Sequence, residues 1–389
     1  MAPSLAYSRL LRLLGVCAPL ALVGCTGAVR PVDTPNTPQG PDPVAQLTPV
    51  VNPLPPLTPE EREAAERLRE EVQALVALGE RNRNDEWRLA TATDHLAARL
   101  EQLGASVQRQ GFEVDGVLAQ NLVVDVPGLR WGDQWVVVAA RFDSPGGSPG
   151  ADDNASGVAG LLELVRGALT QRAQRSQRFV FWSDAGGRAS LEASGAAHQV
   201  QLAQADDEAI VMVLELQGLG RYRTEPGTQQ YAQGMPQGPS VGDFLNVTSY
   251  AQFAAIAERF TTRLAEHCSL PVRSEIWLEP QGQDSAHAAF VLRGYPAILV
   301  GDTGQRRDAA IGTSKDLPEA LDYERMARAV VGLRQALPVL TGPVGEVPDL
   351  KDSTLPGAPE VSLPPVDEPP TSDSPQASPE AAEPPAEVP

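Results

Sequence analysis

The chain has 389 residues, with 50 acidic side chains against 31 lysines and arginines, so its formal net charge is −19. This negative balance argues against nucleic acid, or an anionic lipid surface, as the main binding partner. Of the 36 prolines, 23 lie within residues 31–59 and 343–389, a composition that does not suit a packed core. The sequence between these segments is therefore predicted to form one folded domain over residues 60–341.

The first 24 residues are predicted to be an export signal. Two arginines precede an apolar run over residues 13–23, which is too short to span a membrane. The run ends in Leu-Val-Gly-Cys at residues 22–25, which resembles the lipobox of bacterial lipoproteins. The resemblance implies that Cys25 is acylated and anchors an exported protein through its lipid. Inner-membrane lipoproteins often carry aspartate where this chain has Thr26, so an outer-membrane anchor facing the periplasm is expected. The alternative is an ordinary secretory signal with an incidental cysteine.

Two proline-rich segments flank the predicted domain. Residues 25–59 are predicted to be an extended tether, because proline restricts φ and removes a backbone donor. Residues 342–389 contain ten acidic side chains, one lysine and thirteen prolines, and are predicted to be a disordered tail. Neither segment contains a motif that indicates a specific ligand.

The predicted domain alternates helices and strands. Thr58 and Glu61 have the spacing of a capping box, so a helix is predicted to begin directly after Thr58. Further helices are predicted over residues 85–103, 156–172, 250–267, 285–292 and 321–337, and strands over residues 112–114, 118–126, 135–140, 179–182, 210–216, 273–278 and 297–300. A short helix is expected to follow residue 182. This alternation predicts an α/β fold, with a mainly parallel, mixed and twisted sheet covered by helices on both faces. Residues 218–244 lack periodicity and are predicted to form a surface loop or lid.

Five segments follow one another as they do in a known enzyme family. They are residues 149–157, with the sequence PGADDNASG, and residues 179–182, 214–218, 285–290 and 294–297. In order and spacing they resemble the co-catalytic di-zinc aminopeptidase family. That family includes bacterial leucine aminopeptidases, glutaminyl cyclases and the transferrin receptor ectodomain, which has the fold without the activity. The resemblance implies a zinc-aminopeptidase-like fold, in which one carboxylate bridges two zinc ions and a glutamate acts as general base on the bridging water.

This sequence departs from the family at most of the zinc ligands. Arg141 stands where the family has a ligand histidine, and arginine stays protonated and offers no lone pair to a metal. Gly312 stands at the position of the other ligand histidine, and Gly187 at that of a ligand glutamate. Gly186 occupies the position of the general base, although a register shift of one residue would leave Asp184 as the nearest carboxylate.

Carboxylates remain at the other positions of the site. Asp153 stands at the bridging aspartate and Glu215 at the third ligand aspartate, so these two would hold a metal if one is bound. Asp143 and Asp152 are residual carboxylates beside them. A cluster of carboxylates is costly to bury without a cation. We therefore expect the guanidinium of Arg141 to replace the metal charge and to pair with Asp153 or Glu215.

The chain has only four histidines that could supply missing ligands. His95, His198 and His267 are predicted to lie on helices away from the strand ends. His287 stands at a family position that is usually structural. A zinc site built from these residues would require rearranged strands, because zinc needs ligands that converge at short, fixed distances.

The incomplete ligand set favours a non-catalytic protein, without a cofactor, that binds a peptide or protein in the former substrate cleft or acts as a scaffold. The alternative is an active zinc-dependent aminopeptidase whose ligands are rearranged among Asp184, Glu192 and His287. A third hypothesis is a calcium or magnesium site formed by the oxygens of the four remaining carboxylates. The positive charge of Arg141 argues against this third hypothesis.

Overall fold

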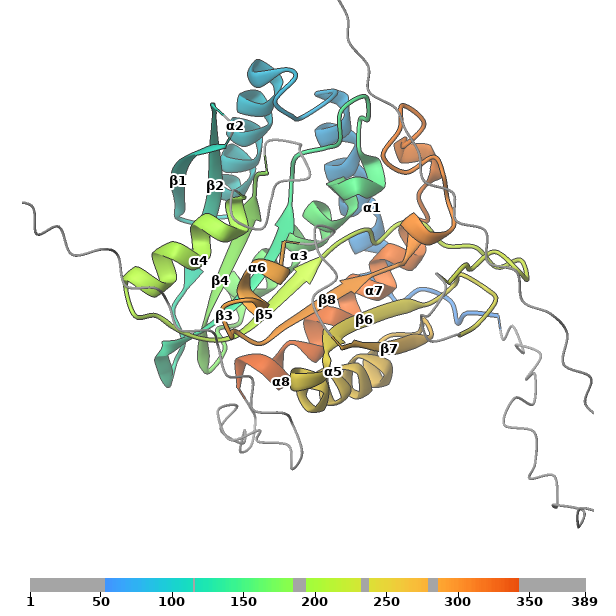
Figure 1. The fold of residues 1–389 in the computed structure, drawn as a ribbon. Coiled ribbons are helices and arrows are strands. Elements are labelled where there is room, and N and C mark those ends of the chain that lie inside the picture. The colour runs from blue at the N-terminus through green and yellow to red at the C-terminus, as the bar shows by residue number, and fades with distance from the viewer. Residues whose placement is uncertain (1–52, 115, 185–193, 232–237, 279–285, 343–389) are drawn as a thin grey trace, which may run out of the picture. The chain divides into compact units, whose positions relative to one another are not determined.

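An eight-stranded sheet forms the centre of the folded part of the chain (Figure 1). The computed structural model describes residues 53–114, 116–184, 194–231, 238–278 and 286–342. The strands are β1 (Val107–Val114), β2 (Val117–Val126), β3 (Trp131–Arg141), β4 (Arg175–Trp182), β5 (Ala209–Leu216), β6 (Leu245–Tyr250), β7 (Val272–Trp277) and β8 (Ala297–Gly301). They lie side by side in the order β1-β2-β4-β3-β5-β8-β6-β7.

The sheet is mixed, with a parallel centre. Strand β3 runs parallel to both β4 and β5, and β5 runs parallel to β8. On one side, β2 is antiparallel to β4 and β1 is antiparallel to β2. On the other side, β6 is antiparallel to β8 and parallel to β7. This topology confirms the predicted mainly parallel, mixed sheet.

Helices cover both faces of the sheet. They are α1 (Pro59–Ala77), α2 (Glu86–Gln102), α3 (Ser156–Thr170), α4 (Gly195–Ala205), α5 (Ala254–His267), α6 (Ala288–Val291), α7 (Tyr323–Ala336) and α8 (Pro338–Thr341). Apolar residues of α1, α2, α3, α5 and α7 join one hydrophobic core, and those of α4 and α6 join a second. Figure 1 shows α4 and α6 on the face of the sheet opposite to α3 and α7.

Strand β3 explains why the centre of the sheet has an uninterrupted apolar sequence. Val136, Val138 and Ala140 point into the first core, while Val137 and Ala139 point into the second. All five side chains are fully buried. Alternate residues of a strand face opposite sides, so a strand covered on both faces needs apolar residues at every position.

The predicted start of α1 is confirmed. The backbone amide of Glu61 donates to Thr58 Oγ1 at 3.2 Å, and the amide of Thr58 donates to Glu61 Oε2 at 2.7 Å. Pro59 occupies the first turn, where its missing amide hydrogen removes no intrahelical bond. The reciprocal bonds satisfy two amide groups that a helix start leaves without intrahelical partners.

Strand β6 was not predicted, and a helix was wrongly expected to begin at Tyr250. This strand is buried along its whole length although it contains polar residues, so it shows neither alternation nor an apolar run. Its polar side chains find partners within the strand and on its neighbours, and Asn246 Nδ2 donates to Thr248 Oγ1 of the same strand at 2.8 Å. Asn246 Nδ2 donates to Glu275 Oε2 on β7 at 3.2 Å, and Ser249 Oγ donates to the carbonyl of Ala297 on β8 at 3.1 Å. The helix expected over residues 285–292 is shorter in the structure and spans only Ala288–Val291.

The ends of the chain carry predictions that the structure does not test. The export signal with Cys25, most of the tether over residues 25–59, and the tail apart from Gly342 lie outside the described residues. Among the residues that are described, no helix combines the length and the apolar character needed to cross a bilayer. The boundaries proposed for these end segments therefore stay predictions.

Candidate functional site

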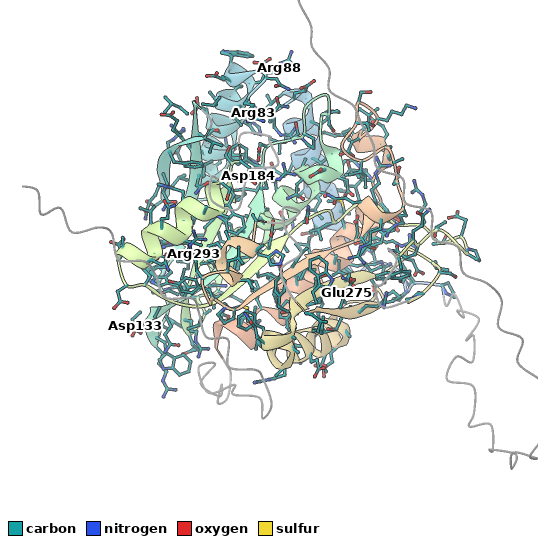
Figure 2. The ribbon with its side chains drawn as sticks, in the orientation of Figure 1. Arg83, Arg88, Asp133, Asp184, Glu275 and Arg293 are labelled. Carbon is teal, nitrogen blue, oxygen red and sulfur yellow. The ribbon has the colours of Figure 1, made fainter. Side chains whose placement is uncertain are left out.

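The predicted site residues meet where the parallel strands end. Arg141, the last residue of β3, is paired with Trp182 at the end of β4. Ala139 of β3 is paired with Glu215 of β5. Because parallel strands end at the same edge of a sheet, the side chains that follow β3, β4 and β5 gather at one edge. Figure 2 labels one of them, Asp184, just beyond the end of β4.

Arg141 forms an ion pair with Asp153. Its Nη2 lies 2.5 Å from Asp153 Oδ1, and its Nη1 lies 4.0 Å from Asp143 Oδ1. Burial by itself lowers the pKa of Arg141, but the carboxylates around it, led by Asp153 and Asp143, raise that pKa above its ordinary value. The predicted pairing with Asp153 is thus confirmed, and the guanidinium stays charged at any working pH.

Glu215, the other partner considered for Arg141, is hydrogen-bonded elsewhere. Its Oε2 accepts from the backbone amide of His287 at 2.8 Å and lies 2.9 Å from Nδ1 of the same residue. Its Oε1 accepts from the amide of Ala286 at 3.3 Å. The carboxylate of Glu215 is therefore hydrogen-bonded by the two residues that precede α6. The His287 side chain is fully buried, which agrees with a structural role for this residue.

A second pair of buried carboxyl groups joins the ends of β3 and β4. Asp143 Oδ1 accepts from the backbone amide of Asp184 at 3.3 Å, and Asp184 Oδ1 accepts from the amide of Gly195 at 3.1 Å. Burial and the charge of Asp143 raise the pKa of Asp184 to about 7, although Arg141 acts in the opposite direction. Asp184 therefore changes its charge near neutral pH, beside Arg141.

Asp152 does not belong to this group of residues. Its Oδ1 accepts from Ser156 Oγ at 3.0 Å and from the amide of Gly220 at 2.9 Å. Burial, together with the nearby carboxylates of Asp302 and Asp316, raises its pKa well above the ordinary value. The four carboxylates of the calcium or magnesium hypothesis are thus divided among different partners. Within the described residues there is no group of three or more metal-binding side chains close enough to share an ion, so the structure offers this hypothesis no support.

The contacts of Asp152 also correct the prediction for residues 218–244. The beginning of this segment is buried instead of forming a surface loop, because backbone groups at Gly218 and Gly220 bond to the core. The amide of Gly220 donates to Asp152, and the carbonyl of Gly218 accepts from the amide of Asp302 at 2.8 Å. Residues 223–228 are largely exposed, and residues 232–237 lie outside the described residues.

Three glycines stand at the remaining family positions, and the structure describes only Gly312 among them. A Cβ atom built on Gly312 would lie 3.9 Å from Asp153 Oδ2, so this residue is next to the Asp153 carboxylate, as the resemblance implies. Its φ of +73° suits glycine and disfavours a side chain. Gly186 and Gly187 lie outside the described residues, so their assignment to the base and ligand positions stays a prediction.

Sequence reasoning missed Arg81, a fully buried cation beside the site. Its side chain is completely buried and donates to the carbonyls of Phe142 at 2.9 Å, Pro149 at 2.6 Å and Gly150 at 3.1 Å. Burial lowers the pKa of Arg81 to about 10, while Asp143 raises it, so the group is protonated at neutral pH. Arg81 lies between two helices in a segment without a motif, and its position along the chain gives no signal.

Asp316 and Arg221 were also missed. The carboxylate of Asp316 accepts from the backbone amides of Asp152 at 3.0 Å and Asp153 at 3.1 Å, and thereby positions the loop that carries Asp153. Arg221 Nη2 lies 3.4 Å from Asp316 Oδ1, and its Nη1 lies 2.9 Å from Asp308 Oδ2. These partners are far apart in sequence, so no local pattern connects them.

The described residues do not fit the zinc centre that the resemblance implies. Zinc is held at ~2 Å by lone pairs of carboxylate, imidazole or thiolate groups that converge on it. Here a guanidinium contacts Asp153, and the carboxylate of Glu215 is bonded at the start of α6. Arg141 and Gly312 stand where the resemblance implies ligand histidines, and neither offers a lone pair from its side chain.

Comparison with known proteins places this geometry in a family. The model of the family described as Peptidase family M28 matches residues 121–336. The uncharacterized protein YfbL of Escherichia coli (strain K12) is 29% identical over 244 residues, which cover 59% of this chain and 74% of that protein.

Solved structures share the fold at low sequence identity. The LapA aminopeptidase of Legionella pneumophila has a TM-score of 0.55 at 18% identity, over 72% of this chain and 75% of that chain. A Zn-dependent exopeptidase from Parabacteroides distasonis has a TM-score of 0.54 at 17% identity, over 75% of this chain and 100% of that chain. A glutaminyl cyclase of Bacteroides thetaiotaomicron has a TM-score of 0.53 at 17% identity, over 70% of this chain and 96% of that chain. At these identities the likeness establishes the fold, which is the predicted zinc-aminopeptidase-like one, and leaves the chemistry to the site itself.

Proposed function

Because the chain belongs to peptidase family M28, we propose that it is a non-catalytic member of the family that binds a peptide or protein, or acts as a scaffold, from a lipid anchor on the cell envelope. One observation carries the proposal: Arg141 Nη2 lies 2.5 Å from Asp153 Oδ1. Arg141 stands at a ligand position, has no lone pair to give, and takes an oxygen of the carboxylate at the bridging position.

The missing general base supports the same proposal. Gly186, at the predicted position of the base, has no side chain that can accept a proton from water. The loss of a general base commonly lowers the rate ~10²–10⁴-fold. A fold can persist in a family after its chemistry is lost, because packing and catalysis depend on different residues. In this proposal, the peptide or protein would bind in the former substrate cleft of the family.

The alternative is an active zinc-dependent aminopeptidase with rearranged ligands. The observation that favours it is the contact of Asp184 with Asp143, whose Oδ1 accepts from the Asp184 amide at 3.3 Å. Burial and the charge of Asp143 raise the pKa of Asp184 to about 7. A carboxylate with a pKa near the working pH is well suited to accept a proton from water. In this alternative Asp184 would act as the base, and metal ligands would come from His287 or from residues such as Glu192, which lies outside the described residues.

Metal content and hydrolysis measured together distinguish the two functions. The purified full-length protein is dialysed against zinc, analysed for bound metal, and assayed with aminoacyl anilides beside an active M28 aminopeptidase as positive control. We expect substoichiometric zinc and no turnover above the buffer rate, because Arg141 competes for Asp153. One or two zinc ions per chain, with turnover that EDTA abolishes and Asp184→Asn removes, would establish the alternative.

The proposed lipid anchor has its own test at Cys25. The support is the sequence at residues 22–25, which resembles a lipobox. Each methylene group of an acyl chain on Cys25 would contribute ~0.8 kcal/mol to membrane binding. We expect the wild-type protein to incorporate labelled palmitate and to fractionate with the outer membrane. Cys25→Ser is expected to lose the label and the outer-membrane association. Unlabelled wild-type protein in the soluble periplasmic fraction would instead indicate an ordinary secretory signal.

A further inference from the structure

We propose that the guanidinium of Arg141 serves as the fixed positive charge of this site in place of a metal ion, and that it makes the fold independent of bound metal. The proposal concerns the stability of the site and holds whichever ligand or partner the protein has. It is therefore tested separately from the proposed function.

The charge distribution around Arg141 requires a cation. Four carboxylates act on its guanidinium, and in order of effect they are those of Asp153, Asp143, Asp184 and Glu215. Asp143 is fully buried, and the Asp153 and Glu215 side chains are nearly so. Buried carboxylates without a nearby positive charge are strongly destabilising, so whatever occupies this position must supply that charge.

Two other buried arginines, Arg81 and Arg221, direct their hydrogen bonds to different partners. Arg81 directs its donors at the backbone carbonyls of Phe142, Pro149 and Gly150. Arg221 bonds to Asp308 and Asp316. Within the part of the chain that the structure describes, Arg141 is the cation whose hydrogen bond to Asp153 is observed. Arg81 also acts electrostatically on Asp143 and Asp153, so Arg141 supplies the direct contact to Asp153 and Arg81 adds a second positive charge nearby.

The guanidinium and a metal ion exclude each other at Oδ1 of Asp153. A zinc ion held by this carboxylate would lie ~2.0–2.2 Å from its oxygen. Nη2 of Arg141 already lies 2.5 Å from Oδ1, so an ion bound there would overlap the guanidinium and would be repelled by its charge. Removing the guanidinium should consequently create both the space and the electrostatic demand for a cation.

Three substitutions at Arg141 test this exchange. Arg141→Lys keeps the charge, Arg141→Met removes it while keeping an unbranched chain, and Arg141→His removes the permanent charge while offering a nitrogen ligand. Thermal unfolding of the purified full-length protein is measured in EDTA and in excess zinc, and zinc binding is measured by calorimetry. Arg263→Met, at an exposed ion pair with Glu266, is the matched control.

The expected results follow from the exchange of one cation for another. The wild type, Arg141→Lys and Arg263→Met should unfold at the same temperature in EDTA and in zinc. In EDTA, Arg141→Met and Arg141→His should unfold at least ~5 °C lower than the wild type. Zinc should restore most of that loss in Arg141→His, with about one ion bound per chain. If Arg141→Met does not fold, Arg141→Lys and Arg141→His still complete the comparison.

Two results would overturn the proposal. One is a wild-type protein that zinc stabilises as strongly as Arg141→His, since the guanidinium would then not stand in for a metal. The other is an Arg141→His protein that is neither less stable than the wild type in EDTA nor able to bind zinc. Both readouts are stabilities or binding stoichiometries, so they are independent of the hydrolysis assay that tests the proposed function.

Discussion

Replacing Arg81 with methionine is expected to lower the free energy of unfolding by ~3–5 kcal/mol. Methionine occupies much of the same space, but it removes the guanidinium that donates to the carbonyls of Phe142, Pro149 and Gly150. The carbonyl of Gly150 still accepts from the amide of Ala155, so the main loss falls on Phe142 and Pro149. Each unsatisfied buried acceptor costs ~1–3 kcal/mol. These carbonyls begin and end the loop that connects β3 to the turn carrying Asp153, so the loss should also loosen the candidate site.

Urea unfolding at neutral pH measures this effect. Arg81→Lys is expected to be intermediate, because lysine keeps the charge but presents its donors from a single point and cannot reach several carbonyls as a planar guanidinium does. Arg263→Met, on the exposed surface of α5, should change the free energy by less than ~0.5 kcal/mol. An Arg81→Met protein within ~1 kcal/mol of the wild type would show that the loop is held by other contacts.

Asp184→Asn is expected to stabilise the protein above neutral pH by ~2–4 kcal/mol and to have little effect near pH 4. Burial and Asp143 raise the pKa of Asp184 from 3.8 to about 7 in the folded state. Between these values the folded state holds a proton that the unfolded chain has released, so stability falls as the pH rises from about 4 to 7. Asparagine removes this loss and keeps an oxygen that can accept from the amide of Gly195.

The measurement is the free energy of unfolding of both proteins at intervals between pH 4 and pH 8.5. Asp133, exposed near the start of β3, supplies the control substitution Asp133→Asn, which should not change the shape of the pH profile. Figure 2 shows Asp184 and Asp133 at opposite ends of the sheet. A difference between Asp184→Asn and the wild type that is the same at every pH would contradict the raised pKa.

Much of the fold could be predicted because its central elements have strong local signals. The apolar run of β3, the capping box of α1 and the helical spacing of α7 each arise from contacts that neighbouring residues dictate. Strand β6 could not be predicted in the same way. Its sequence, LNVTSY, is half polar, and the neighbouring strands β7 and β8 supply further partners for Asn246 and Ser249.

Some residues of the candidate site could be predicted from the sequence, and others could not. The identity of a residue already excludes some chemistry, since arginine and glycine cannot ligate zinc through their side chains. The sequence therefore indicated Arg141, Asp153 and Gly312 as positions of interest. It did not indicate Arg81 or Asp316, because an isolated charged residue in a loop is ordinarily exposed to solvent and only burial makes it significant.

The sequence by itself determined the zinc-aminopeptidase-like α/β fold, and it led to the prediction that Arg141 and Gly312 stand in place of two ligand histidines. Both conclusions depend on residue identity and on periodicity, which can be seen along the chain. Only the tertiary structure decided that Arg141 pairs with Asp153 while Glu215 bonds to His287, 72 residues away. Only it showed that Arg81 reaches Phe142, 61 residues away. Such partners are selected by burial and by distances between side chains, and these arise when distant strands and loops are packed against one another.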